Sequence, residues 1–97
     1  MEVWFDVDKK DVIEIVEKRK DCFPWENHPD EKYSCLIFRE DGIIRMTVNE
    51  FFELDDHTFE CCRYYTDRIA DTLEEYKAIT DEKIALAAYS AWCSGAR

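Results

Sequence analysis

The segment from Asp56 to Ala78 limits the possible folds of this chain more than any other segment. At 100° per residue, its apolar and its acidic side chains fall on opposite sides of a helix. This pattern predicts one long amphipathic helix, capped at its start by Asp55 or Asp56, whose apolar side must be covered by the rest of the chain. The predicted apolar stripe contains Cys62, Tyr65, Ile69, Leu73 and Tyr76, and the acidic side contains Glu60, Asp67, Asp71, Glu74 and Glu75.

The first part of the chain predicts a strand followed by another helix. Residues 2–7 alternate loosely between apolar and polar side chains and include valine, tryptophan and phenylalanine, which favours a short strand. Asp8 is a suitable N-cap, and the helix that it starts is expected to run to about Lys20. The buried side of this helix would hold Val12, Ile13 and Val16.

Residues 21–33 are expected to form an irregular connection. Pro24 and Pro29 each push the preceding residue out of the helical region, so no helix can cross this segment. We expect Phe23 and Trp25 to fold back onto the core, because large rings are rarely left in water.

The pair Asp41-Gly42 predicts a tight turn between two strands of a hairpin. With a two-residue turn, Ile37 lies opposite Met46 and both face the core. The other face is half apolar and needs a partial cover, which could come from the first strand, the proline-containing loop or a partner. That face carries Leu36, Phe38, Arg45 and Thr47, and the core face also carries Cys35, Ile44 and Val48.

The remaining segments complete the expected fold class. Residues 49–56 lead into the long helix, and a last helix is predicted from about Thr80 to about Trp92. Together these elements predict one α+β domain over residues 1–97, with a small antiparallel sheet of about three strands and two to three helices packed on one face. The expected buried anchors are Phe51, Phe52 and Leu54 before the long helix, and Ile84, Ala85, Ala88 and Trp92 on the last one.

The net charge of −10 limits the partners of this chain. With 23 acidic and 13 basic residues, it repels nucleic acid and anionic membranes and attracts basic surfaces. The surplus is uneven, because residues 21–58 carry ten acidic residues against three basic ones. A charge that served solubility alone would be spread more evenly, so we expect an acidic binding surface.

Catalytic and metal sites find little support in the sequence. Two glycines cannot form a phosphate-binding loop. His57 and Cys61 could form a thiol–imidazole pair on the predicted helix, but we favour the simpler explanation that Cys61 flanks the apolar stripe and His57 lies in the solvated first turn. A zinc site would draw on Cys22, His28, Cys35, His57 and Cys61 or Cys62, but their spacing matches no zinc finger or ribbon. We therefore expect neither an enzyme nor a cofactor.

The cellular compartment is predicted from the N-terminus and the cysteines. The first ten residues lack the apolar run of a signal peptide, and no stretch approaches the roughly 18 apolar residues of a membrane span. Five cysteines, two of them adjacent, make a poor disulfide framework. We expect a cytoplasmic protein with reduced thiols.

The acidic residues supply the candidate site. On the predicted long helix, successive carboxylates are separated by roughly 4.5–10 Å, and a DNA strand advances one phosphate per roughly 3.4 Å. Such a row, flanked by acidic loops, could enter a groove lined with lysine and arginine. The predicted partner-binding residues are Asp30, Glu31, Glu40, Asp41, Glu53, Asp55, Asp56, Glu60, Asp67, Asp71, Glu74 and Glu75.

In its length, charge and acidic rows, the chain resembles the small phage-encoded inhibitors that mimic DNA, among them anti-restriction and anti-CRISPR proteins. The resemblance implies a protein of the host cytoplasm that occupies the DNA-binding groove of a host defence complex and blocks target DNA, with a CRISPR surveillance complex as the favoured partner. It implies no direct contact with nucleic acid or membrane. The many aromatic residues and the basic run from Lys18 to Lys20 depart from the pattern.

Two other functions stay open. The first is an intracellular protein-interaction module that uses the Leu36 and Phe38 face of the hairpin together with aromatic side chains such as Trp4 or Trp25. The second is a small metal- or thiol-dependent enzyme. The half-apolar hairpin face is compatible with either a monomer or a dimer.

Overall fold

Strands are the most frequent regular element of the structure. The computed structural model describes residues 3–96, and in this range the chain forms seven strands, two α-helices and three 3₁₀ turns. The strands are β1 (Trp4–Asp8), β2 (Val12–Arg19), β3 (Lys32–Glu40), β4 (Ile43–Val48), β5 (Phe51–Glu53), β6 (Thr58–Cys62) and β7 (Thr66–Ala70), and the helices are α1 (Leu73–Lys77) and α2 (Asp81–Gly95). The predicted arrangement of about three strands with two to three helices on one face is therefore wrong.

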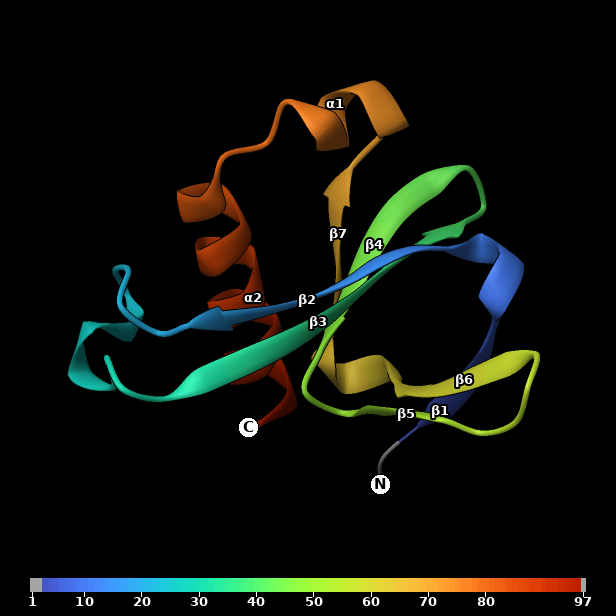
Figure 1. The fold of residues 1–97 in the computed structure, drawn as a ribbon, viewed down its shortest axis with the longest axis horizontal. Helices are drawn as coiled ribbons and strands as arrows, with labels where there is room; N and C mark the ends of the chain where they lie inside the picture. Colours follow the sequence, from blue (N-terminus) through green and yellow to red (C-terminus); the bar gives the residue numbers. More distant parts are fainter. Residues whose placement is uncertain (1–2, 97) are drawn as a thin grey trace.

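The strands form two antiparallel sheets, and the chain passes from one sheet to the other at three places. The larger sheet has the order β2-β3-β4-β7, and the small sheet has the order β1-β6-β5. The turn Lys9–Asp11 leads from β1 into β2, residues 49–50 lead from β4 into β5, and the turn Arg63–Tyr65 leads from β6 into β7. Each of these segments thus begins in one sheet and ends in the other (Figure 1). Corners of this kind are typical of two sheets whose strands cross.

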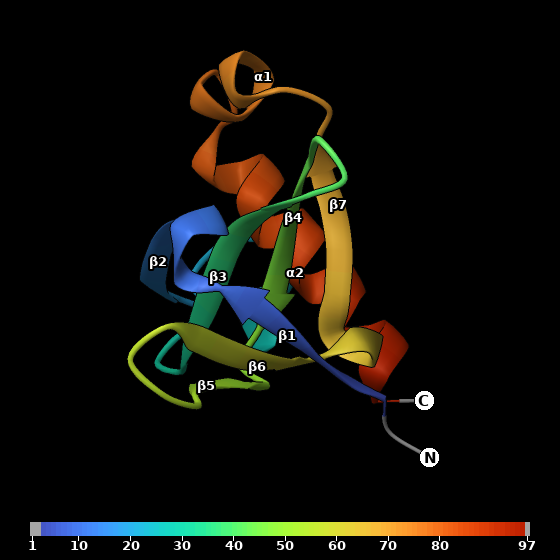
Figure 2. The ribbon, with the colours of Figure 1, turned by 90° about the vertical axis from the view of Figure 1, so that its right-hand side faces the viewer.

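The core has three layers, with the larger sheet in the middle. Alternate residues of β3 face opposite ways: Cys35 and Ile37 pack in the cluster that includes α2, and Leu36 and Phe38 pack against the small sheet. All four side chains are fully buried. Figure 2 shows the small sheet at the lower end of the molecule and α2 behind the larger sheet. The half-apolar face of the hairpin is therefore covered from within the chain, by the first strand and its neighbours.

The predicted hairpin and the last helix are confirmed. Ile37 lies opposite Met46, as a two-residue turn requires. Asp41 (φ 55°) and Gly42 (φ 79°) both adopt the left-handed conformation that such a turn needs. The side chain of Thr80 caps α2, which runs three residues further than expected and buries Ala91 more completely than Trp92.

The predicted helix from Asp8 to Lys20 is wrong, because residues 12–19 form β2. Asp8 does cap a turn, but only the single 3₁₀ turn at the corner, where its carboxylate accepts a hydrogen bond from the Lys10 amide. The apolar residues of this segment are all β-branched valines and isoleucines, which lose side-chain freedom in a helix and fit a strand.

The predicted long helix from residue 56 to residue 78 is also wrong. The segment forms β6, a 3₁₀ turn, β7 and only then the short helix α1. Asp55 and Asp56 lie in the β5–β6 turn, where Asp55 accepts a hydrogen bond from the His57 amide (2.8 Å) instead of capping a helix. Threonine, phenylalanine, tyrosine and isoleucine are frequent between residues 58 and 69, and they favour strands.

Three residues that were expected to be buried are exposed. Phe52 (47%) and Leu54 (48%) are not anchors of a helix, although Phe51 is half-buried. In the connection after β2, Trp25 is buried as expected and donates a hydrogen bond to the Ala85 carbonyl (3.0 Å). Phe23 in the same connection is 63% exposed.

Candidate functional site

Three turns bring many carboxylates to one end of the molecule. The β3–β4 turn, the corner between β1 and β2, and the β5–β6 turn follow one another along the right-hand side of Figure 1. We call this surface the acidic end. It comprises Asp6, Asp8, Asp11, Glu40, Asp41, Glu53, Asp55, Asp56 and Glu60.

Contacts between the turns make the acidic end one continuous surface. A hollow of about 390 Å³ lies between the β1–β2 corner and the β3–β4 turn, and five of the nine carboxylates line it. The amide of Lys9 donates a hydrogen bond to the carbonyl of His57 (2.8 Å), which holds the corner against the β5–β6 turn. On the small sheet, Asp6 lies directly opposite Glu60.

Only part of this negative charge is balanced. Glu40 accepts two hydrogen bonds from Arg63 (2.9 and 3.0 Å) and lies 3.2 Å from the Nε atom of Arg45. The bond from Arg63 holds the pKa of Glu40 below its usual value. Lys9 pairs with Glu53 (3.1 Å), and the Nζ atom of Lys10 lies 3.9 Å from Asp8. Within residues 3–96, no ion pair is formed by Asp6, Asp11, Asp41, Asp55, Asp56 or Glu60.

Backbone geometry fixes two of these unpaired carboxylates. Asp41 occupies a left-handed position of a tight turn, which aspartate tolerates better than most residues. The hydrogen bond from the His57 amide lowers the pKa of Asp55, so this carboxylate is charged at neutral pH. The charges of the acidic end are thus held by turns whose strands continue into the core.

An aromatic face borders the acidic end. Trp4, Asp6, Cys62, Glu60 and Phe52 share one side of the small sheet, because they are cross-strand partners in its register. We call this side the outer face. The rings of Trp4 and Phe52 lie 5.7 Å apart across β6, and the fully buried Cys62 belongs to the strand between them. Phe52 and Asp6 are exposed, so the face is open to solvent.

The structure separates the other predicted site residues from the acidic end. Asp30 and Glu31 lie in the connection at the opposite side of Figure 1, where they pair with Arg19 (3.5 Å) and Lys20 (3.0 Å). The hydrogen bond from Lys20 lowers the pKa of Glu31. Asp67 belongs to β7, Asp71 precedes α1 and pairs with Arg68, and Glu74 and Glu75 belong to α1 at the top of Figure 1.

The predicted row of carboxylates on one helix therefore does not exist. Glu40, Asp41, Glu53, Asp55, Asp56 and Glu60 are brought together, but by turns and strands instead of a helix. The sequence prediction missed Asp6, Asp8 and Asp11. Their signal was present, since the first two alternate along a strand and therefore share one face.

No family model, curated protein or solved structure matches this chain. Its function must therefore be inferred from its own surface.

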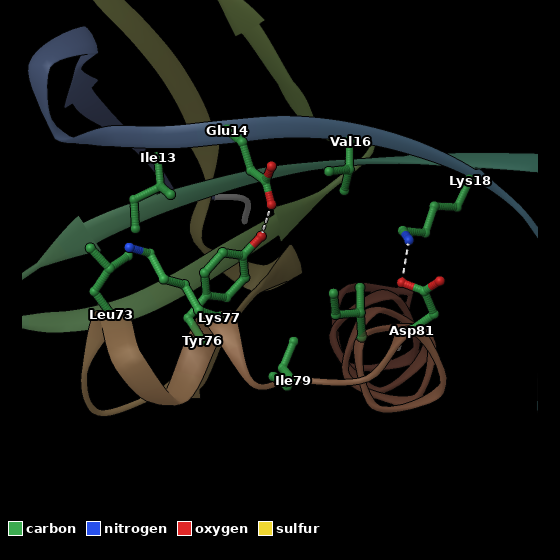
Figure 3. Close-up of a pocket in the computed structure, with 10 residues that line it drawn as sticks. Ile13, Glu14, Val16, Lys18, Leu73, Tyr76, Lys77, Ile79 and Asp81 are labelled. Carbon is green, nitrogen blue, oxygen red and sulfur yellow. Dashed lines mark hydrogen bonds and ion pairs between the residues drawn. The ribbon is translucent and has the colours of Figure 1, made fainter.

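A second hollow, of about 470 Å³, lies between β2 and the two α-helices (Figure 3). Four of its polar side chains are paired: the hydroxyl of Tyr76 donates a hydrogen bond to Glu14, and Lys18 pairs with Asp81 (2.6 Å). Burial raises the pKa of Tyr76, which keeps the hydroxyl protonated as a donor. The rest of the wall is aliphatic except for Lys77, so the hollow presents one ammonium group without an ion pair among the described residues.

The residues considered for metal or thiol chemistry do not form such a site. Between residues 3 and 96, no group of three or more histidine, cysteine, aspartate or glutamate residues is arranged to hold a metal ion. Cys61 is fully buried, and burial raises its pKa to about 11, while His57 lies exposed in the β5–β6 turn. All five cysteines are free thiols. None of the described helices is long and apolar enough to cross a membrane.

Proposed function

We propose that this protein is a binding protein whose acidic end docks on a basic, nucleic-acid-binding groove of a partner and excludes the nucleic acid. The observation that carries the proposal is the group of carboxylates without ion pairs that three turns and the small sheet hold together at one end. The proposed partner is a host defence complex, with a CRISPR surveillance complex favoured, because the chain resembles the DNA-mimic inhibitors in size and charge.

A basic groove can accept carboxylates in place of phosphates for two physical reasons. Opposite charge speeds the encounter of the two proteins and favours binding at low salt. Carboxylates on turns that are already ordered lose little conformational freedom on binding, which lowers the cost of association. The carboxylates proposed for docking are those of the acidic end, and the carboxylates of β7 and α1 are outside it.

The experiment measures displacement of fluorescent target DNA from a purified CRISPR surveillance complex by fluorescence anisotropy. One variant combines Asp41→Asn, Asp55→Asn and Asp56→Asn at the acidic end. The matched control combines Asp67→Asn, Glu74→Gln and Glu75→Gln, and removes the same three charges elsewhere. Exposed charge pairs contribute about 0.2–1 kcal/mol each, so the first variant should lose about tenfold in potency. The control should lose less than about threefold, because only its long-range charge effect remains.

Two results would count against the proposal. If both variants weaken displacement equally, net charge matters and the acidic end is not the docking surface. If the unchanged protein displaces no DNA from the complex at 50 mM salt, where charge attraction is weakly screened, occupation of this DNA-binding groove is refuted.

A further inference from the structure

The outer face of the small sheet carries two aromatic rings beside two carboxylates that lack a cation. We propose that this face binds arginine side chains of the basic partner, with the guanidinium stacked on the Trp4–Phe52 pair and hydrogen-bonded to Asp6 and Glu60. This inference rests on the proposed function, because it names the chemical group that the basic partner presents.

Asp6 and Glu60 are two opposed carboxylates without a neighbouring cation among the described residues to balance them. They lie directly opposite each other on neighbouring strands, and no ion pair from another described residue balances either of them. Like charges in directly opposed positions destabilise a sheet. A guanidinium has five donors and can bond to both carboxylates at once, which would relieve the repulsion.

The rings supply the second half of an arginine site. Phe52 is exposed over about half of its surface and lies beside Glu60 in the register, while Trp4 lies two residues before Asp6 on β1. A planar guanidinium stacks on aromatic rings and bonds to a carboxylate at the same time, whereas the compact ammonium of lysine does the first less well.

The same chemistry is already satisfied inside the protein. The Cζ atom of Arg63 lies 3.5 Å from the centre of the Phe5 ring, and Arg63 also donates two hydrogen bonds to Glu40. Phe5 follows Trp4 on β1 and points to the opposite side of the sheet. The outer face therefore has the ring and the carboxylate of this arrangement without its arginine.

The negative charge of the outer face favours a basic segment over a second copy of this chain as its binding partner. A second copy of this chain would bring Asp6 and Glu60 against another surface of a protein with a net charge of −10, which is unfavourable unless a basic patch meets them. An arginine-bearing segment has the complementary charge and the planar group that fits both the rings and the carboxylates. The proposal commits to that occupant.

The test compares nona-arginine with nona-lysine, labelled peptides of equal charge, by fluorescence anisotropy at 0.15 M salt. The unchanged protein should bind nona-arginine about two- to fivefold more tightly than it binds nona-lysine, as expected for one exposed stacking contact. Phe52→Leu should bring this ratio of affinities close to one, because the carboxylates alone bind the two peptides about equally well. The matched control Phe23→Leu removes an exposed phenylalanine (63%) from the connection after β2 and should leave the ratio unchanged.

A measurement on the unchanged protein tests the site even if the Phe52→Leu variant does not fold. In ¹H–¹⁵N NMR spectra, nona-arginine should shift the indole signal of Trp4 and the amide signals of Phe52 and Glu60, while the indole signal of the buried Trp25 stays in place. Equal affinities for the two peptides, or shifts confined to other surfaces, would overturn the arginine site. The proposal that the acidic end docks on a basic groove would not be affected. Failure of both peptides to bind at 50 mM salt would overturn the proposed function as well.

Discussion

Replacing Leu36 by alanine tests whether the small sheet packs on the larger one. Leu36 is fully buried and packs in a cluster with Val7, Phe38 and Cys61. Ile15 is its cross-strand partner on β2 and shares its face, but Ile15 is 50% exposed. The two side chains are isomers that lie side by side on one face of the larger sheet, and they differ in how completely they are covered.

The expected sizes follow from this difference. Removal of a fully buried leucine side chain costs about 2–5 kcal/mol, whereas a half-exposed isoleucine should cost about 1 kcal/mol or less. A chain of 97 residues has an unfolding entropy near 0.2 kcal/mol/K, so Leu36→Ala should lower Tm by about 10–25 °C and Ile15→Ala by about 5 °C or less. Thermal unfolding followed by circular dichroism measures both. Similar small losses for the two variants would refute the packing of the two sheets.

Two further predictions concern thiols and pH. In the native protein Cys22 and Cys93 should react with a disulfide reagent at pH 8, while Cys35, Cys61 and Cys62 should react only after unfolding, because burial raises the pKa of Cys35 to about 12 and of Cys61 to about 11. More than two fast thiols would show that the core is open. Because Arg63 lowers the pKa of Glu40, their interaction stabilises the fold fully above the ordinary glutamate pKa and is lost as the pH falls through the lowered value. Glu40→Gln should therefore lower Tm by about 5 °C at pH 7, as expected for about 1 kcal/mol, and by much less at pH 3, and an equal effect at both values would contradict the ion pair.

The parts of the fold that were predicted correctly depend on local signals. Asp41-Gly42 admits one tight turn between two apolar runs, and this turn sets the register of Ile37 and Met46. Thr80 followed by two acidic residues marks the start of a helix whether or not it is packed. In both places, chain neighbours determine the conformation.

The errors arose where the periodic pattern fitted two structures. Val12, Ile13 and Val16 match one face of a helix, but they match a bulged edge strand equally well, and the pairing of this strand with β3 decides the outcome. From Cys62 to Tyr76 the helical stripe was a coincidence across the end of β6, the strand β7, two turns and the short helix α1. The high frequency of β-branched and aromatic residues was the better guide there.

The candidate site was predicted in part for the same reason. Acidic turns were recognised because they are local, so Asp41, Asp55 and Asp56 were included. Their neighbourhood with Asp6 and Asp11 depends on the pairing of β1 with β6, which joins residues at least fifty positions apart. No local pattern reports such a contact.

The connections and the packing between the two sheets determine how stable the proposed surface is against local opening. β1, β5 and β6 are each joined directly to a strand of the larger sheet, and the small sheet covers the fully buried Leu36 and Phe38. Detachment of the small sheet would expose these two side chains to water, so the cluster that they form with Val7 and Cys61 opposes local opening of this end. The spacing of the carboxylates near these connections therefore depends on the packing between the two sheets, and it should change when that packing is lost.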